Sequence, residues 1–139
     1  MNGNIPSLGA DASLLDEMIA EGKMLYYLDL MLPDTQDSIK IGFTREQTSW
    51  CIENESDMWK FFVGEELLFS KKMQDKYRYL KDAPNSYNMP KESPGKAAIW
   101  VGWQIVRNYM QHEKGISLNQ LFNEMDAIKI LKESNYSGE

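Results

Sequence analysis

The sequence predicts an all-α fold, a single compact helical domain of about five to six helices around a central helix that contains tryptophan and glycine. Three observations predict this fold. Apolar residues recur every three or four positions from Ser13 to Leu131. Serine, threonine or aspartate, which are preferred at helix N-termini, precede most of these apolar runs. The 139 residues, of which 42% are hydrophobic, are enough for one domain with a sizeable core.

The central helix is expected between Ser93 and Gly115, the longest run with a start, an apolar middle and a stop. Ser93 can cap it, Pro94 suits its first turn, and Gly115 can adopt the left-handed conformation that ends a helix. Apolar side chains cover most of its circumference, which is typical of a helix packed on several sides. These side chains are Ile99, Trp100, Val101, Trp103, Val106 and Met110.

The chain before this helix predicts a flexible tail, residues 1–12, followed by the helical domain, residues 13–139. Ser13 is the expected N-cap of the first helix, because acidic residues and a helical apolar period follow it. Pro33 is expected to end this helix, since proline cannot continue the hydrogen-bond ladder.

A loop is expected after the first helix, with at most a short strand in which Ile39 and Ile41 alternate. Thr44 and Gln47 then match a capping box, in which each side chain bonds the other residue's backbone N–H. This pattern predicts a second helix that extends to about Val63.

Three shorter helices are expected in the remaining chain. An amphipathic helix over residues 71–81 would place Met73, Tyr77 and Leu80 on its apolar face. Ser117 and Asp126 are the expected N-caps of two short helices that complete the domain.

Composition excludes several classes of function. The net charge of -6 and the isoelectric point near 4.9 argue against a nucleic-acid or anionic-membrane partner. The single cysteine, Cys51, excludes an internal disulfide and a cysteine-based zinc site. The first residues lack a basic segment followed by an apolar one, so no signal peptide is expected within this chain.

No catalytic residue, metal site or cofactor is expected from the motifs. His112 and Glu113 begin a pattern like that of zinc peptidases, but position 116 is isoleucine and the chain has one histidine. The favoured interpretation of His112 is a residue near a helix C-terminus, where the helix dipole attracts cations. Cys51 lies beside Trp50 on an apolar helical stripe and is expected in the core.

Carboxylates and aromatic residues leave alternatives open. Glu17 and Glu21 are four residues apart and could form an acid/base pair or a cation site, although a solvated helix face is favoured. The tryptophans could line a sugar or peptide groove, but their helical spacing favours the core, and methionine is expected as core filler. The tryptophans are Trp50, Trp59, Trp100 and Trp103.

Two long stretches, beginning LLDEMIAEGKMLYYLDLMLPD and PKESPGKAAIWVGWQIVRNYM, resemble the C-terminal part of the gliding motility lipoproteins called GldB, found in Bacteroidetes. The resemblance covers roughly residues 13–136. Family members are longer at the N-terminus, so a truncated relative is expected. The residues that carry the resemblance or a structural role in it are Glu21, Gly22, Trp50, Trp59, Pro94, Gly95, Gly102, Trp103, Gln104 and Arg107.

That family is in turn distantly similar to predicted zincin-type metallopeptidases, whose third zinc ligand is a glutamate followed by glycine on a helix. Glu21 and Gly22 match this pair, which makes Glu21 a weak candidate ligand. The histidine ligands would lie outside this chain. The similarity therefore implies a fold like the C-terminal part of a zincin and a peptidase scaffold that is inactive.

The resemblance implies a non-enzymatic protein on the periplasmic face of the outer membrane, acting in gliding or in the type IX secretion linked to it. Its expected partners are other envelope proteins, and its expected membrane attachment is a lipid anchor that this chain lacks. A homodimer is also expected, because an apolar face left by the missing region would need cover. The residues expected at that dimer contact are Leu14, Met18, Leu25 and Leu28.

Overall fold

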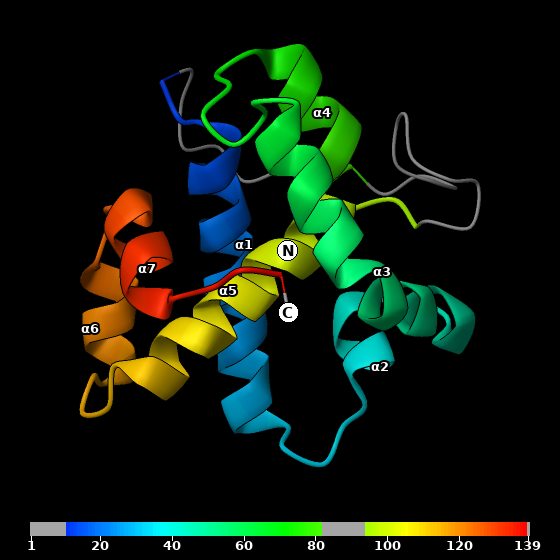
Figure 1. Ribbon diagram of the computed structural model, residues 1–139. Coiled ribbons are helices and arrows are strands. Elements are labelled where there is room, and N and C mark those ends of the chain that lie inside the picture. The colour runs from blue at the N-terminus through cyan, green and yellow to red at the C-terminus, as the bar shows by residue number, and fades with distance from the viewer. Residues whose placement is uncertain (1–10, 82–93, 139) are drawn as a thin grey trace.

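Seven helices and no strand make up the part of the chain that the computed structural model describes, residues 11–81 and 94–138 (Figure 1). This arrangement confirms the all-α prediction, with one helix more than expected. The helices are α1 (Leu14–Met31), α2 (Asp37–Ile41), α3 (Arg45–Gly64), α4 (Met73–Leu80), α5 (Ala97–His112), α6 (Leu118–Asn123) and α7 (Ala127–Ser134).

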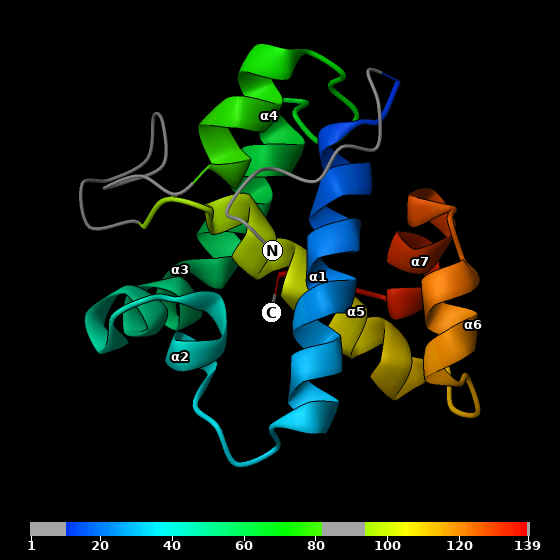
Figure 2. The ribbon, with the colours of Figure 1, turned by 180° about the vertical axis from the view of Figure 1, so that it is seen from behind.

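The centre of the fold is the place where α5 crosses α1 (Figures 1 and 2). Helices α6 and α7 lie on one side of this crossing, α2 and α3 lie on the other, and α4 packs near the start of α1. The crossing is possible because glycines face each other. A Cβ atom on Gly102 would lie 2.1 Å from the backbone oxygen of Met18, and one on Gly22 would lie 2.5 Å from the oxygen of Gly102.

Three helices begin with the reciprocal side-chain bonds of a capping box, which the pattern predicted for α3, while Ser13 and Ser117 are the N-caps predicted for α1 and α6. The pairs are Ser13 with Asp16, Thr44 with Gln47, and Ser117 with Gln120. Two more free N–H groups of α1 donate to the chain between α3 and α4. Leu14 N bonds the oxygen of Ser70, and Leu15 N bonds the oxygen of Leu68, both at 2.8 Å. The start of α1 is therefore fixed by a distant segment.

Two predicted boundaries are wrong. The expected loop, with at most a short strand at Ile39 and Ile41, contains the short helix α2, because Gly42 in a left-handed conformation closes a helical turn there. The central helix begins at Ala97 and not near Pro94, which belongs to a preceding turn. Lys96 occupies the N-cap with a φ of 59°, while the predicted cap Ser93 lies outside the described residues.

Helix α4 buries only one of the three residues predicted for its apolar face, Leu80, which is 2% exposed. Met73 and Tyr77 are exposed, whereas Lys76 is only 1% exposed. The ammonium group of Lys76 donates to the oxygen of Ala12 at 2.9 Å and lies 3.8 Å from a carboxylate oxygen of Glu17. An acceptor and a counter-ion in the interior thus outweigh the weak apolar period of this short helix.

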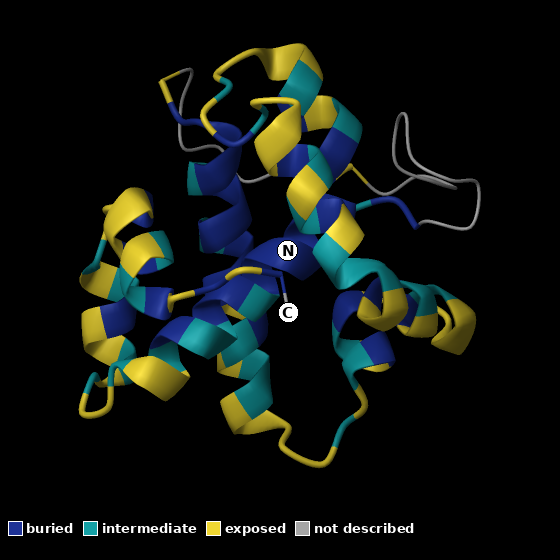
Figure 3. Cartoon of the chain, viewed as in Figure 1, coloured by how far each residue is buried: buried dark blue, intermediate teal, exposed yellow. Residues whose placement is uncertain are grey.

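The core lies along α5 and the N-terminal half of α1, where buried residues concentrate (Figure 3). Trp100, Trp103 and Cys51 are buried, as predicted. The expected solvated pair, Glu17 and Glu21, is wrong, since both residues are less than 10% exposed. Methionine fills the core in part: Met18 and Met58 are buried, but Met24, Met31, Met73 and Met125 are exposed. Among the described residues, no helix has both the length and the apolar character needed to cross a membrane.

Candidate functional site

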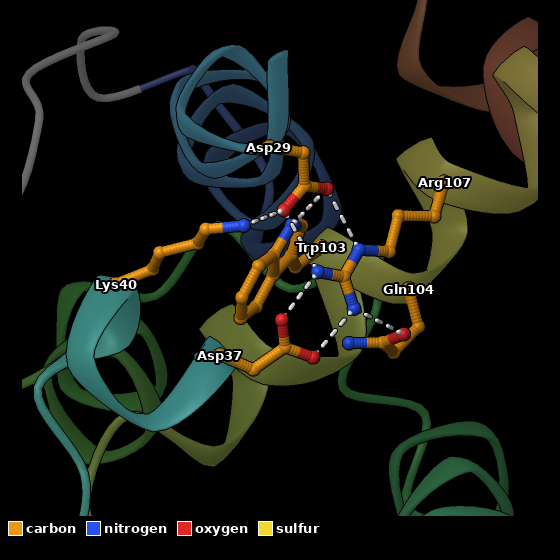
Figure 4. A network of polar contacts seen from close by, with 6 residues as sticks. All are labelled: Asp29, Asp37, Lys40, Trp103, Gln104 and Arg107. Atoms are coloured by element: carbon orange, nitrogen blue, oxygen red, sulfur yellow. Dashed lines mark hydrogen bonds and ion pairs between the residues drawn. The ribbon is translucent and has the colours of Figure 1, made fainter. Parts of the chain in front are cut away.

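The motif residues on α5 meet charged residues of α1 and α2 in one polar network (Figure 4). Arg107 of α5 lies between Asp29 of α1 and Asp37 of α2. Lys40, one turn further along α2, donates to Asp29 at 3.1 Å. Trp103 completes the network, because its indole Nε1 donates to Asp29 at 3.1 Å and its ring lies 3.8 Å from the Arg107 guanidinium carbon.

The guanidinium group of Arg107 uses all of its five N–H donors within this chain. Nε and Nη2 donate to Asp29 at 2.8 Å each, in the paired geometry that makes arginine–carboxylate contacts strong. Nη2 and Nη1 donate to Asp37 at 2.9 and 3.0 Å. The remaining Nη1 bond goes to Gln104 Oε1 at 3.4 Å. The group therefore has no donor left for a ligand, and it holds three helices together.

Burial and ion pairing have opposite effects on the pKa values of Asp29 and Arg107. Burial alone would raise the pKa of Asp29, but the hydrogen bonds and charge of Arg107, with Lys40 and Trp103, hold that pKa below its usual range. Burial opposes the charge of Arg107 as well, yet the two aspartates raise its pKa. Two cations face two carboxylates, so the network carries no net charge.

Sequence reasoning found only the α5 members of this network. Asp29, Asp37 and Lys40 were not singled out as site residues. Asp29 did carry a signal, since it is the only charged residue in the apolar run MLYYLDLML at positions 24–32. A lone carboxylate within an apolar helical run requires a partner, although the run itself does not say which residue provides it.

A second polar cluster lies where α3 and the C-terminal segment meet α5. The Tyr136 hydroxyl donates to Glu55 at 2.8 Å, and the Tyr136 ring meets Trp59 edge to face at 5.0 Å. Burial raises the pKa of Glu55, although Tyr136 and Trp100 oppose that shift. Burial, with the Glu55 charge, also raises the pKa of Cys51 to about 12, which makes this thiol a poor nucleophile at neutral pH.

Glu21, the weak candidate for a zinc ligand, lies at the crossing of α1 and α5. Burial raises its pKa, with Lys96 opposing and Glu17 adding to the shift. Its neighbour Gly22 is explained by the close approach of α5. His112 is exposed at the opposite end of α5, about 15 Å along the axis from the crossing, and its Nδ1 contacts the oxygen of Asn108.

These residues do not fit a zinc site. Within residues 11–81 and 94–138, no three histidine, cysteine or acidic side chains are grouped so that they could hold a metal ion. The glutamate–glycine pair is accounted for by helix packing instead. Burial raises the pKa of Glu21, and the nearby charge of Lys96 opposes that shift without a metal ion.

The other predicted residues have structural surroundings. Trp50 and Trp59 are half-buried and pack against the core, and Pro94 and Gly95 are buried in the turn before α5. The surface named for a homodimer is not available in this fold, since Leu14, Met18 and Leu25 are buried and Leu28 is partly buried against the core.

The described chain is thus a helical domain whose motif residues join its own helices and leave no unpaired charge on Arg107. The sequence model of the family described as "Gliding motility protein GldB" matches residues 1–138, and the chain belongs to that family. Membership associates it with gliding motility and with lipoproteins of the cell envelope. No curated protein and no solved structure matches the chain.

Proposed function

We propose that this chain is a non-enzymatic protein of the cell envelope that acts through protein contacts in gliding, or in the type IX secretion linked to it. The family match over residues 1–138 carries the proposal. The geometry of the motif residues supports it, because Arg107 and Trp103 direct their donors to Asp29 and Asp37 of the same chain. Because these side chains bond residues of the same chain, we propose that other residues, on the outer surface, contact the partner protein.

The proposed location is the periplasmic face of the outer membrane, with a lipid anchor as the attachment. Membership of a family of envelope lipoproteins supports this location. A lipid anchor, and not surface charge, is the proposed attachment, because the net charge of -6 repels anionic lipid. No nucleic-acid partner is proposed, for the same electrostatic reason.

The rival proposal is a zincin-like peptidase scaffold in which Glu21 would be the third metal ligand. One observation favours it: Glu21 is buried and its pKa is raised, as is common for carboxylates at functional sites. The position of His112 at the far end of α5 weighs against it. The two proposals differ in what the Glu21 carboxylate does.

Deletion of the gene in the encoding organism tests the proposal, with colony spreading and secretion of type IX cargo as the measurements. We expect the deletion to reduce both, and wild-type protein and Glu21→Gln to restore both equally. Glu46→Gln, an exposed glutamate in the first turn of α3, is the control. Metal analysis of the purified protein accompanies the test.

Each outcome decides between the two proposals. A deletion strain that spreads and secretes normally would overturn the proposed function. Stoichiometric zinc in the purified protein, together with loss of restoration by a folded Glu21→Gln variant and not by Glu46→Gln, would establish the peptidase scaffold. The thermal midpoint of Glu21→Gln shows whether that variant folds.

A further inference from the structure

One face of α1 is apolar and exposed, although another face of the same helix packs against α5. Met24, Tyr27 and Met31 are 44%, 39% and 53% exposed, and Leu30 and Leu32 beside them are 47% and 44% exposed. Figure 3 shows the same change along α1, whose N-terminal turns are buried and whose C-terminal turns are not. Apolar side chains gathered in this way are typical of an interaction surface.

The spacing of these residues matches a helix as the occupant. Ala20, Met24, Tyr27 and Met31 follow each other at intervals of four, three and four residues, which is the spacing of a coiled-coil seam. The seam is about 16 Å long, so a partner helix of about three turns would cover it. Methionine suits such a contact, since its flexible side chain adapts to the partner's shape.

A groove continues the seam toward the N-terminus of α1. It has a volume of about 310 Å³ and lies between α1 and the link from α6 to α7. Ile19 and Ala20 line one wall, while Met125 and Ala127 line the other, and Met125 is 72% exposed. The seam and the groove together form the α1 surface, which offers a helix apolar contacts on two sides.

Acidic groups stand at both ends of the α1 surface. Asp11, Asp16 and Glu124 line the groove, and Asp34 is exposed just beyond Met31. The groove also contains Lys23, whose side chain is buried and whose ammonium group donates to the oxygen of Glu124 at 2.5 Å. A partner therefore meets carboxylates at either end of an apolar stripe.

These acidic groups disfavour two possible binding partners of the α1 surface, a second copy of this chain and an anionic lipid surface. A second copy of this chain would bring Asp16 against either Asp16 or Asp34, so that carboxylates face carboxylates in both orientations. The net charge of -6 on each copy adds to that repulsion. An anionic lipid surface is repelled in the same way.

We infer that the α1 surface binds an amphipathic helix of another protein, with an apolar stripe flanked by lysine or arginine at both ends. The inference rests on the proposed function, because it names the class of partner for the proposed protein contacts. Basic groups of the partner would pair with Asp34 at one end and with Asp11 and Asp16 at the other.

Photo-crosslinking in the encoding organism tests the inference. The crosslinking amino acid p-benzoylphenylalanine replaces Tyr27 in one strain and Tyr77, an exposed tyrosine of α4, in the control strain. We expect Tyr27 to give a crosslink to a different polypeptide, whose crosslinked segment has the basic-flanked amphipathic pattern. Tyr77 is expected to give none to that segment.

Paired substitutions make the test specific for the α1 surface. Met24→Glu with Met31→Glu should lower the crosslink yield from Tyr27 at least tenfold, while Met73→Glu on α4 should leave it unchanged. All three methionines are more than 40% exposed, so the thermal midpoints should stay close to that of the parent protein.

Several outcomes would overturn the inference. They are no crosslink from Tyr27, a crosslink to a second copy, a crosslinked segment without basic flanks, and binding to vesicles of phosphatidylcholine and phosphatidylglycerol that Met24→Glu with Met31→Glu abolishes. The deletion phenotype is a separate measurement. A specific Tyr27 crosslink in an organism whose deletion strain spreads and secretes normally would keep the surface and reject the proposed function.

Discussion

Helix α5 meets α1 at two places that differ in chemistry. At Gly102 the backbones of the two helices come so close that a Cβ atom added there would lie against the backbone of Met18. Five residues further along α5, Arg107 meets Asp29 through two hydrogen bonds of 2.8 Å, and Asp37 and Lys40 join them. The contact at Gly102 requires a residue without a Cβ atom, whereas the contact at Arg107 requires oppositely charged side chains. We expect the glycine contact to be less tolerant of change, because backbone cannot move aside as side chains do.

The largest effect is expected from Gly102→Ala. The added Cβ would lie 2.1 Å from the oxygen of Met18, so α1 and α5 would have to separate. We expect the free energy of unfolding to fall by at least about 4 kcal/mol, measured by denaturant titration with circular dichroism. Gly64→Ala is the matched control, since nothing lies within 4 Å of its Cβ. A cost below about 1 kcal/mol for Gly102→Ala would show that the helices do not touch there.

Trp103→Ala is expected to lower the free energy of unfolding by about 3–5 kcal/mol, as truncation of a buried aromatic residue does. The ring is fully buried, contacts Trp100 edge to face at 5.6 Å and lies between the two contacts. Trp103→Phe keeps one aromatic ring but loses the bond to Asp29 and part of the buried volume, so an intermediate cost of about 1–3 kcal/mol is expected. Equal costs for the two variants would show that the remaining phenyl ring adds no stability by packing.

Arg107→Met should lower the free energy of unfolding by about 2–3 kcal/mol, because Asp29 and Asp37 lose their shared cation. The effect is moderate since the Arg107 and Asp37 side chains remain 27% and 34% exposed and water can solvate part of the charge. Arg45→Met, on the exposed first turn of α3, is the control and should change stability by less than about 0.5 kcal/mol. Equal effects of the two arginine substitutions would mean that the network adds no stability.

The smallest effects are pH dependences, and they should have opposite signs. The pKa of Asp29 is lowered by folding, so its contribution to stability is present above about pH 4 and is lost as the pH falls through the folded value. The pKa of Glu55 is raised by folding, so its contribution is greatest below about pH 4 and is lost as the pH rises through the folded value.

Unfolding curves of Asp29→Asn and Glu55→Gln between pH 3 and 7 measure these contributions. Relative to the parent protein, Asp29→Asn should lose more stability at pH 7 than at pH 3. Glu55→Gln should be nearest to the parent at low pH and should gain relative to it as the pH rises. A common sign for both variants would contradict the pKa directions of one of the two groups.

Local signals predicted the helices well where they were strong. Thr44 and Gln47 identified the start of α3, because a capping box is formed by residues only three positions apart. The start of α5 was placed too early, since Pro94 and Gly95 are compatible with either a helix start or a turn. The bond from the Lys96 backbone N–H to the oxygen of Lys81 accompanies the turn, and no local pattern reports that contact.

The candidate site was predicted only in part for the same reason. The family resemblance included Trp103, Gln104 and Arg107, which are close in the sequence, but it did not indicate which residues they contact. Asp29 and Arg107 are 78 residues apart, and only the crossing of α1 and α5 brings them together. Burial of Glu17 beside Lys76 was missed because charged residues four apart normally indicate a solvated face.

The crossing of α1 and α5 also has a consequence for how the chain is made. A ribosome adds roughly 5–20 residues per second, so the 78 positions from Asp29 to Arg107 take about 4–16 seconds to synthesise. During that interval the helix that covers the apolar side of α1 has not yet been made. Helix formation takes about a microsecond, so the delay is set by translation and not by folding. The apolar side of nascent α1 therefore stays without its α5 partner for seconds.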